Sequence, residues 1–384
     1  MCPFMVGNAS DQMTGHIPQF RVLVLGGYGF FGRRLVERLS HLPGSHIQVA
    51  GRSHGAARAV VQELQDGAVA RLEAVALDAE DPGLESALRQ RAPTVLVNAS
   101  GPFQRADYRV PVACARAGVH YADLADGRDY VCGIGRLHEQ ALAAGVTITS
   151  GASSVPALSS AAADFLATEL AVVQAIDMGI SPGNRTERGL STVRSILTYC
   201  GKPLPSTKSA VFGWAGTRRH VYPSPVGSRL LSPCDVPDLT LFPERYAGAP
   251  EVRFGAGLEL AFLHRGMNIL AWMSRRGIVE DWSRYAKALK RAGDLFKTWG
   301  SDAGAMHVTV QGLSPSGAKV TRTWQLVATQ GHGPFVPTLA AAALVRKLQA
   351  GALPPGAYPC VGLLDLADFT QEMNGLAIRT EVLG

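Results

Sequence analysis

The six cysteines of this 384-residue chain form no C-x-x-C pair and no cluster with histidine residues. This pattern excludes a disulfide framework and a cysteine-based metal site, so we expect reduced thiols, a cytoplasmic protein and no bound metal. The first 18 residues lack the continuous apolar core of a signal peptide, and we expect them to form a flexible arm.

Long hydrophobic runs are missing as well. The most apolar stretch, residues 258–273, is interrupted by His264, Arg265 and Asn268, which makes it too short and too polar to cross a bilayer. We therefore predict no transmembrane segment and expect a buried or interfacial helix at this place.

Neither sign of charge forms a long run, since 37 Lys and Arg residues against 31 Asp and Glu residues leave a net charge of +6. The doublets Arg218-Arg219 and Arg275-Arg276 are short, which favours solvated faces over nucleic-acid binding. An anionic cofactor and an acidic small-molecule substrate account for the positive excess equally well. The hydrophobic content of 47% and the length indicate a globular protein of two domains.

A glycine-rich turn is the most informative feature that the chain does contain. It follows the apolar run 22–25 and precedes a segment with apolar residues at helical spacing, which is the context in which G-x-G-x-x-G binds a dinucleotide. Gly27 then makes the tight turn, Gly29 lets the backbone approach a pyrophosphate, and Gly32 lets the helix pack closely. The free N–H groups of the helix start face the phosphates. An ordinary strand–helix turn is the alternative. The predicted cofactor-binding residues here are Gly26, Gly27, Tyr28, Gly29, Phe30, Phe31 and Gly32.

The second predicted strand ends in an arginine, at the place where NAD-binding sites usually carry a carboxylate. About twenty residues beyond the glycines, NAD sites carry Asp or Glu for the ribose hydroxyls, but this chain has Arg52 followed by Ser53. A carboxylate repels a 2′-phosphate, whereas a guanidinium binds it in a bidentate manner. Arg58, one helical turn further on, adds to the same pocket. The sequence therefore predicts NADP(H), with a solvated arginine at a strand end as the alternative.

Up to residue 149 the chain alternates strand and helix patterns, which predicts a Rossmann-type, doubly wound parallel sheet of six strands. Beyond residue 153 the rhythm changes to an α+β pattern, for which we expect a mixed sheet with helices on one side. Its signals are β-like runs at 191–198 and 209–213, a helical pattern at 278–298, a hairpin turn at 314–317, and an apolar helix at 337–348 that returns to the first domain.

Several segments together resemble the saccharopine dehydrogenase-like oxidoreductases. They are residues 26–32, 98–103 and 114–123, with residues 331–337 similar to the C-terminal segment of bacterial members. The resemblance covers most of the first domain, part of the tail and hardly any of residues 175–300. It implies an NADP-binding domain, an inserted α+β domain for substrate and dimer contacts, and hence a homodimer.

With this resemblance we divide the chain into four parts. They are a flexible arm (1–18), an NADP-binding Rossmann domain (19–152), an α+β substrate and dimerisation domain (153–332), and a C-terminal segment that returns to the Rossmann domain (333–384). One departure limits the resemblance. Residues 151–156 lack the Asp-Pro-Gly sequence of saccharopine-forming enzymes and the aspartate that trans-acting enoyl reductases carry near Ser153. We therefore do not carry over saccharopine as the substrate.

Ligands of a doubly wound sheet lie outside the carboxyl ends of its strands. This rule selects residues 98–103, 121–123 and 150–156 as the lip of the site, with Gly101-Pro102 as a rigid turn beside the nicotinamide. From the first of these segments we predict that Asn98, Ser100, Gly101 and Pro102 bind the cofactor. Asp78 ends the third strand and either accepts a hydrogen bond from the adenine amino group or caps a turn.

Reduction of an imine or carbonyl needs a proton donor near the developing charge. The candidates are Tyr121, Asp123 and His332, and strand geometry puts Tyr121 and Asp123 on the same face. Alternatively, Tyr121 is a core ring and Asp123 a loop cap. For an acidic substrate the chain offers Arg185, Arg194 and Arg322, which the sequence does not rank.

Two hypotheses follow. The first is an NADP(H)-dependent oxidoreductase acting on a C=N, C=O or activated C=C bond; the Tyr-x-x-x-Lys pair of short-chain dehydrogenases is absent, which weakens an alcohol or ketone dehydrogenase. The second is a non-catalytic NADP(H)-binding regulatory or scaffold protein, because a fold does not fix a function. A closed cleft between the domains favours the enzyme, and a flat surface favours the regulator.

Overall fold

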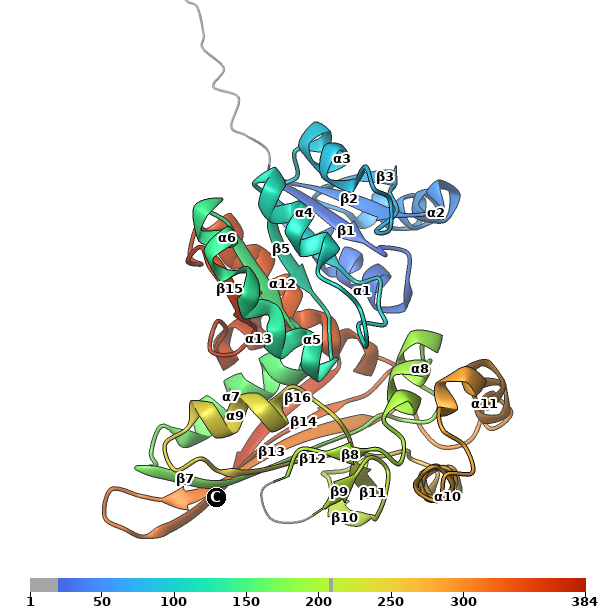
Figure 1. Cartoon of the computed structure of the whole chain (residues 1–384), viewed down its shortest axis with the longest axis vertical. Helices are drawn as coiled ribbons and strands as arrows, with labels where there is room; N and C mark the ends of the chain where they lie inside the picture. The colour runs from blue at the N-terminus through green and yellow to red at the C-terminus, as the bar shows by residue number, and fades with distance from the viewer. Residues whose placement is uncertain (1–19, 207–209) are drawn as a thin grey trace, which may run out of the picture.

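A parallel seven-stranded sheet forms the first half of the protein in a computed structural model that describes residues 20–206 and 210–384. The predicted arm, 1–18, and residue 209 lie outside the described residues. The strand order is β15-β6-β5-β4-β1-β2-β3, and every neighbouring pair is parallel (Figure 1). The strands are β1 (Phe20–Leu25), β2 (Ser45–Gly51), β3 (Arg71–Ala76), β4 (Val95–Asn98), β5 (His120–Asp123), β6 (Thr147–Ser150) and β15 (Gly356–Pro359).

Helices cover both faces of this sheet because its central strand is apolar on both. Val22 and Val24 of β1 pack into one core cluster with residues of α1, α2 and α12, whereas Leu23 and Leu25 pack into another with residues of α3, α4 and α6. The helices of this half are α1 (Phe30–Leu39), α2 (His54–Leu64), α3 (Leu84–Arg91), α4 (Arg109–Ala117), α5 (Arg128–Cys132), α6 (His138–Ala143), α12 (Val336–Gln349) and α13 (Leu366–Met373).

A second seven-stranded sheet is mixed, in the order β10-β11-β12-β7-β13-β14-β16, with β12 and β7 parallel and the other pairs antiparallel. Its strands are β7 (Val172–Ser181), β10 (Arg218–Val221), β11 (Ser228–Pro233), β12 (Glu251–Ala256), β13 (Gly304–Leu313), β14 (Lys319–Ala328) and β16 (Ile378–Leu383), beside a small pair β8 (Pro203–Leu204) and β9 (Val211–Phe212). The hairpin of β13 and β14 is the one predicted around residues 314–317.

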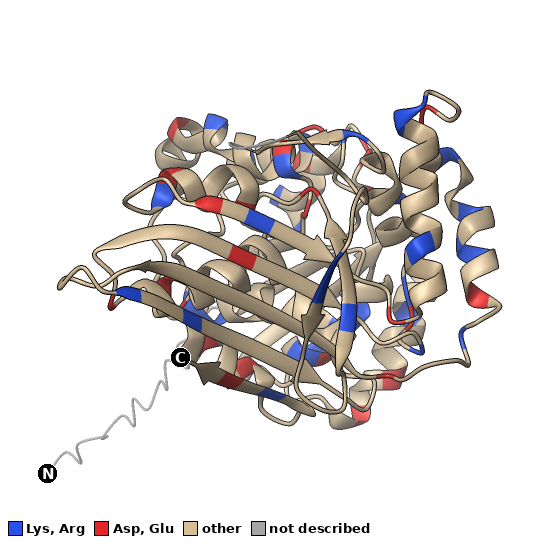
Figure 2. Ribbon diagram, turned by 90° about the horizontal axis from the view of Figure 1, so that it is seen from below, with Lys and Arg blue, Asp and Glu red and all other residues tan. Residues whose placement is uncertain are grey.

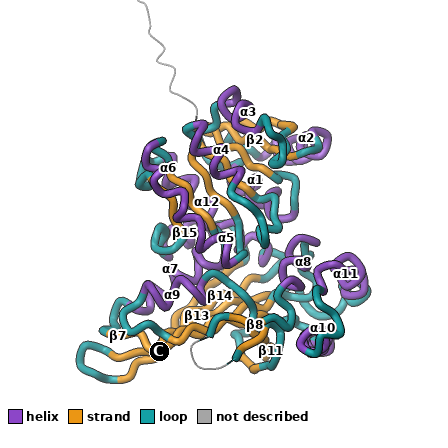
Figure 3. Tube along the Cα trace, in the orientation of Figure 1, coloured by secondary structure: helices purple, strands orange, loops and turns teal. Residues whose placement is uncertain are grey.

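Helices α7 (Ser159–Ala167) and α9 (Asp238–Arg245) lie between the two sheets, and Figure 3 shows them above β13 and β14. Helices α8 (Leu190–Thr198), α10 (Ala261–Arg275) and α11 (Ala286–Asp294) gather at one end of the second sheet. Figure 2 views the molecule from below, with the strands of the second sheet in front. Short 3-10 turns occur at Gln65–Gly67, Gly133–Leu137, Trp282–Tyr285 and Gly333–Phe335, and a π turn at Ser154–Leu158.

The β-like prediction for residues 191–198 is wrong, because these residues form helix α8. β-Branched side chains raised the strand signal, but Ser195 and Leu197 are buried and the helix packs against α11 and the turn before it. Tertiary packing overrides local propensity here. The apolar stretch 258–273 forms most of α10, and within the described ranges no helix has the length and hydropathy to cross a membrane.

The C-terminal segment contributes to both sheets. The predicted apolar helix is α12, which packs against α1 and α13, and the chain then adds β15 beside β6. Its last strand, β16, pairs antiparallel with β14 of the second sheet. The fold class is therefore as predicted: a Rossmann-type sheet, a second α+β part and a returning C-terminal segment.

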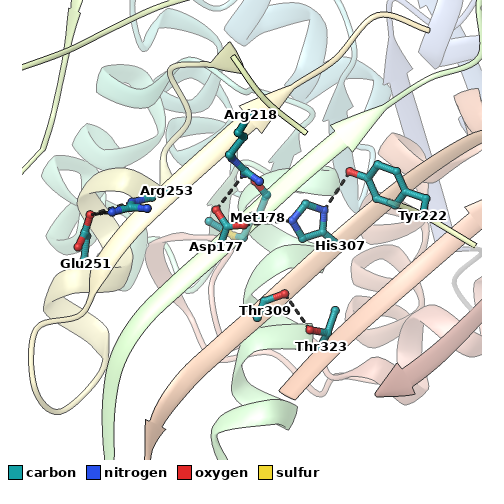
Figure 4. A network of polar contacts seen from close by, with 9 residues as sticks. All are labelled: Asp177, Met178, Arg218, Tyr222, Glu251, Arg253, His307, Thr309 and Thr323. Atoms are coloured by element: carbon teal, nitrogen blue, oxygen red, sulfur yellow. Dashed lines mark hydrogen bonds and ion pairs between the residues drawn. The ribbon is translucent and has the colours of Figure 1, made fainter. Parts of the chain in front are cut away.

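A network of polar side chains fixes the strands of the second sheet (Figure 4). His307 on β13 is fully buried; its Nδ1 lies 2.9 Å from the hydroxyl of Tyr222, and its Nε2 faces the carboxylate of Asp177. Asp177 in turn forms an ion pair of 2.9 Å with Arg218. Burial lowers the pKa of His307, so its neutral ring accepts a hydrogen bond from the Tyr222 hydroxyl at Nδ1. This network holds β7, β10 and β13 together, away from the cavity described next.

Candidate functional site

A cavity of about 710 Å³ opens at the carboxyl ends of β1 to β4. Its wall comes from both halves of the protein, because Gly189, which lies next to Phe30, and residues of α8 line it together with the glycine turn. The lining residues are Leu25, Gly26, Tyr28–Phe31, Gly51, Arg52, Leu77–Glu80, Ala99–Phe103, Leu124, Asp126, Gly189–Thr192, Arg194 and Ser195. The size is in the range of ligand pockets.

The glycine turn at one end of the cavity leaves backbone donors free. Gly26 has φ +79°, which favours glycine, and the N–H groups of Gly26 and Gly27 both donate to the carbonyl of Ala50. The sharp turn is therefore at Gly26 rather than at Gly27. A Cβ on Gly32 would overlap the carbonyl oxygen of Gly26, so only glycine lets α1 approach this closely.

The first N–H that bonds within α1 is that of Arg33, which donates to Gly29 O at 2.9 Å. The N–H groups of Phe30, Phe31 and Gly32 have no acceptor among the described residues. Such orphan donors at a helix start bind anions, so the turn fits a diphosphate. Phe30 and Phe31 line the cavity, whereas Gly27 and Gly32 lie behind it.

The end of β2 presents one free cation to the cavity. Arg52 is exposed, lines the cavity and has no ion-pair partner among the described residues. Ser53 caps α2, since its hydroxyl accepts from Ala56 N–H at 3.2 Å, and its own N–H donates to the hydroxyl of Tyr28 at 3.1 Å. Ser53 therefore positions Tyr28, and Arg58 on α2 is exposed but does not line the cavity.

Two further predicted cofactor residues shape loops. Asp78 lines the cavity and accepts from Glu80 N–H at 3.1 Å, which is the turn-capping role; its contact with adenine stays a prediction. Asn98 is buried, and its Oδ1 accepts from the N–H of Ser100 at 3.0 Å and from the Ser100 hydroxyl. Asn98 thus fixes the loop through which Ser100, Gly101 and Pro102 reach the cavity.

Of the three predicted proton donors, Tyr121 and Asp123 lie beside each other and His332 lies apart, and none lines the cavity. Tyr121 is 1% exposed, its hydroxyl contacts that of Tyr130 at 3.3 Å, and burial raises its pKa. His332 accepts from Ala377 N–H at 2.7 Å and so anchors the C-terminal segment. Their observed contacts are structural.

Asp123 is fully buried at the end of β5. Its Oδ1 accepts from the N–H groups of Ala125 and Gly151 at 3.0 and 2.8 Å, and from the hydroxyl of Ser150 at 3.0 Å. Its Oδ2 has no partner among the described residues. Burial raises the pKa of this carboxyl to about 6 despite the three donors.

The raised pKa of Asp123 makes the stability of the folded protein depend on pH, and Asp123→Asn should remove this dependence. The folded state binds the proton more tightly than the unfolded state, whose pKa is near 3.8, so stability falls as pH rises from about 4 to about 6. The loss approaches about 3 kcal/mol. We expect urea unfolding from pH 4.5 to 7 to show this decline in the wild type relative to Asp123→Asn. Parallel profiles would contradict the assignment.

The structure brings Asp126 to the cavity, which sequence reasoning missed. Asp126 accepts from Gln104 Nε2 at 2.9 Å and from the hydroxyl of Ser195 at 3.4 Å, and Gln104 also contacts Ser195. Burial raises the pKa of Asp126. The only sequence signal was its place just after β5, in the loop that follows the strand end. Asp126 is the carboxyl that joins the two halves at the cavity.

Of the three arginines suggested for an acidic substrate, the structure brings Arg194 alone to the cavity. Arg194 is exposed on α8 and has no ion-pair partner among the residues described. Arg185 donates to Thr298 O at 3.3 Å, and Arg322 pairs with Glu169 at 2.9 Å. Within residues 20–206 and 210–384, no His, Cys, Asp and Glu side chains group as metal ligands.

Comparison with known proteins identifies relatives of the nucleotide-binding half. Residues 22–149 match the family model described as saccharopine dehydrogenase NADP binding domain. A trans-acting enoyl reductase of Mycobacterium tuberculosis is 34% identical over 143 residues, which are 36% of this chain and 34% of that protein. A putative trans-acting enoyl reductase of the same species is 33% identical over 148 residues, or 38% and 35% of the two chains. The chain thus matches about a third of the length of these relatives.

A solved structure extends the similarity to the whole fold. Apo saccharopine dehydrogenase (L-Glu forming) from Saccharomyces cerevisiae aligns with a TM-score of 0.65 and 14% identity, over 95% of this chain and 100% of that one. At this identity the match shows a shared fold. It agrees with the resemblance seen in the glycine turn and the segments around Asn98 and Tyr121.

Proposed function

The chain is saccharopine dehydrogenase-like in its nucleotide-binding domain and in its fold, and from this premise we propose that it is an NADP(H)-dependent oxidoreductase. The observation that carries the proposal is the cavity, which is lined by the glycine turn, by Asp126 and by residues of α8. A regulator needs no such cavity between the two halves, so the enzyme is favoured over a non-catalytic NADP(H)-binding protein. When bound, the cofactor supplies or accepts a hydride at its nicotinamide ring.

The residues at the glycine end fit the cofactor. The free N–H groups of Phe30 and Phe31 meet a diphosphate, and Arg52 meets a 2′-phosphate with a guanidinium that has no ion-pair partner among the described residues. Between them, the loop of Ser100 to Pro102, which Asn98 fixes, gives the dinucleotide a backbone surface to lie against.

The other end of the cavity holds the groups for proton transfer and substrate binding. Asp126 lies at the cavity, and burial raises its pKa toward the range in which a carboxylic acid donates a proton. Gln104 and Ser195 orient it. Arg194, on the same helix as Ser195, is suited to an acidic group of the substrate. We assign Asp126 the role that the sequence suggested for Tyr121, Asp123 or His332.

The substrate is a C=N, C=O or activated C=C bond, and the names of the relatives put activated C=C first. The same proposal includes domain divisions after residues 152 and 332 and a homodimer. The substrate domain then contributes α8, with Arg194 and Ser195, to the cavity.

The proposal is tested by NADPH consumption with a panel of enoyl thioesters, cyclic imines and 2-keto acids. NADPH binding is measured in parallel by its fluorescence. We expect binding, and turnover of one class above the background without acceptor. Binding without turnover across the panel would support the regulator, and absence of binding would remove the dinucleotide assignment itself.

A further inference from the structure

Helix α10 carries apolar residues on the side that faces solvent as well as on the side that faces the protein. His264 is fully buried, with Nε2 2.9 Å from the hydroxyl of Ser232, and Asn268 donates to Trp214 O at 2.7 Å. The side of the helix that faces the protein combines these hydrogen bonds with apolar contacts of Met267, Leu270 and Ala271. A surface helix normally turns its apolar side to the core.

Three large apolar residues of α10 nevertheless face outward. Phe262, Ile269 and Trp272 are 46%, 58% and 50% exposed, and Arg265 and Arg276 lie between and beyond them. Steps of three and four residues put all five on one face of the helix. The guanidinium of Arg276 lies 5.4 Å from the centre of the Trp272 ring. This face alternates large apolar groups with cations.

The same character continues beyond α10. The Phe262 ring contacts those of Phe296 and Trp299 at 4.9 and 6.1 Å, so the segment after α11 joins the exposed stripe. Seven of the thirteen large exposed hydrophobic residues in the described part of the chain lie within residues 261–299. They are Phe262, Ile269, Trp272, Ile278, Tyr285, Leu295 and Trp299. We give the name α10–α11 face to the residues that helical spacing and ring contacts connect, which are Phe262, Arg265, Ile269, Trp272, Arg276, Phe296 and Trp299.

The net charge of the protein is concentrated on the same segment. Residues 261–299 hold eight Lys and Arg residues against three Asp and Glu residues, so they carry +5 of the total +6. The positive excess is therefore concentrated in one continuous segment of the chain. Figure 2 shows the blue bands along α10 and α11.

We propose that the α10–α11 face binds the surface of an anionic lipid bilayer. Two copies apposed through this face would bring like charges together, which opposes a dimer here. Aromatic and aliphatic side chains enter the boundary between headgroups and acyl chains, while Arg and Lys remain beside the lipid phosphates. The stacked Trp272 and Arg276 are suited to that boundary. The proposal does not depend on the redox activity.

The test is flotation of the full chain with phosphatidylcholine vesicles that contain 0 or about 30% phosphatidylserine. We expect binding to the anionic vesicles only, weakened by high salt. Arg265→Gln with Arg276→Gln should lower the affinity about thirtyfold, at about 1 kcal/mol for each cation. Ile269→Asp with Trp272→Asp should abolish binding, and Val69→Asp, at an apolar residue that is 64% exposed elsewhere, should leave it unchanged.

Circular dichroism and NADPH binding check that the variants fold. Binding that is equal for neutral and anionic vesicles, or unchanged in the α10 variants, would overturn the proposal. So would a dimer that Trp272→Asp dissociates in sedimentation, which would make the face a subunit interface. Retention on immobilised polyglutamate without vesicle binding would likewise overturn it, in favour of an acidic protein.

Discussion

Arg52→Asp lowers the affinity for NADPH by about 100- to 1,000-fold and leaves that for NADH within a few-fold. The substitution removes charge-assisted hydrogen bonds worth about 1.5–3 kcal/mol and adds repulsion between a carboxylate and the 2′-phosphate. Each 1.4 kcal/mol is about tenfold in the dissociation constant. The effect is large because no carboxylate among the described residues pairs with Arg52 and weakens its attraction for the 2′-phosphate. Titration of NADPH and NADH fluorescence measures both constants.

The matched control is Arg71→Asp, which makes the same change of charge on the neighbouring strand. Arg71 is exposed at the amino end of β3, whereas the cavity lies at the carboxyl ends of the strands. It should change NADPH binding by no more than about twofold, through screened long-range charge. If Arg52→Asp weakens the two cofactors equally, the arginine acts on the shared part of the nucleotide and the NADP(H) assignment falls.

Asp126→Asn lowers kcat by about 100- to 10,000-fold with the acceptor that the panel identifies, as expected for loss of a proton donor. NADPH affinity should change little, because the glycine turn and Arg52 are untouched. The pH profile of kcat should also lose the limb that Asp126 imposes. In the wild type this limb lies above the ordinary carboxyl range, since burial raises the pKa of Asp126.

Asp129→Asn is the matched control for Asp126. Asp129 lies three residues further along, is exposed and pairs with Arg128 at 2.9 Å. It removes the same charge outside the cavity and should leave kcat within about twofold. Asp126→Asn could instead lower stability and acceptor affinity without changing kcat. This result would show that Asp126 only holds the two halves together, through Gln104 and Ser195.

The nucleotide-binding half was predictable because its signals are local. The apolar run of β1, the glycine turn and the apolar spacing of α1 stand next to one another in the chain, and together they specify the strand, turn and helix. Arg52 was found by a fixed spacing from the same turn. The rule that ligands lie at strand ends also selected the loop of Ser100 to Pro102, which lines the cavity.

The substrate end was not predictable because it is made by contacts between distant segments. Gln104 and Ser195 are 91 residues apart in the chain and meet at Asp126. No sequence pattern near any of the three residues indicates this contact. Tyr121 and Asp123 share a strand face as expected, but packing closes over that face and leaves them buried. The residues of helix α8, which supplies Ser195, have a β-like sequence pattern.

The last residues of the chain form the outer edge of two sheets at once. Strand β15 covers the free side of β6, and β16 covers that of β14. An uncovered strand edge is a template for pairing with other chains. Loss of the residues after α12, by proteolysis or a premature stop, would therefore expose the inner strands β6 and β14 to pairing with other chains and make the protein prone to aggregate.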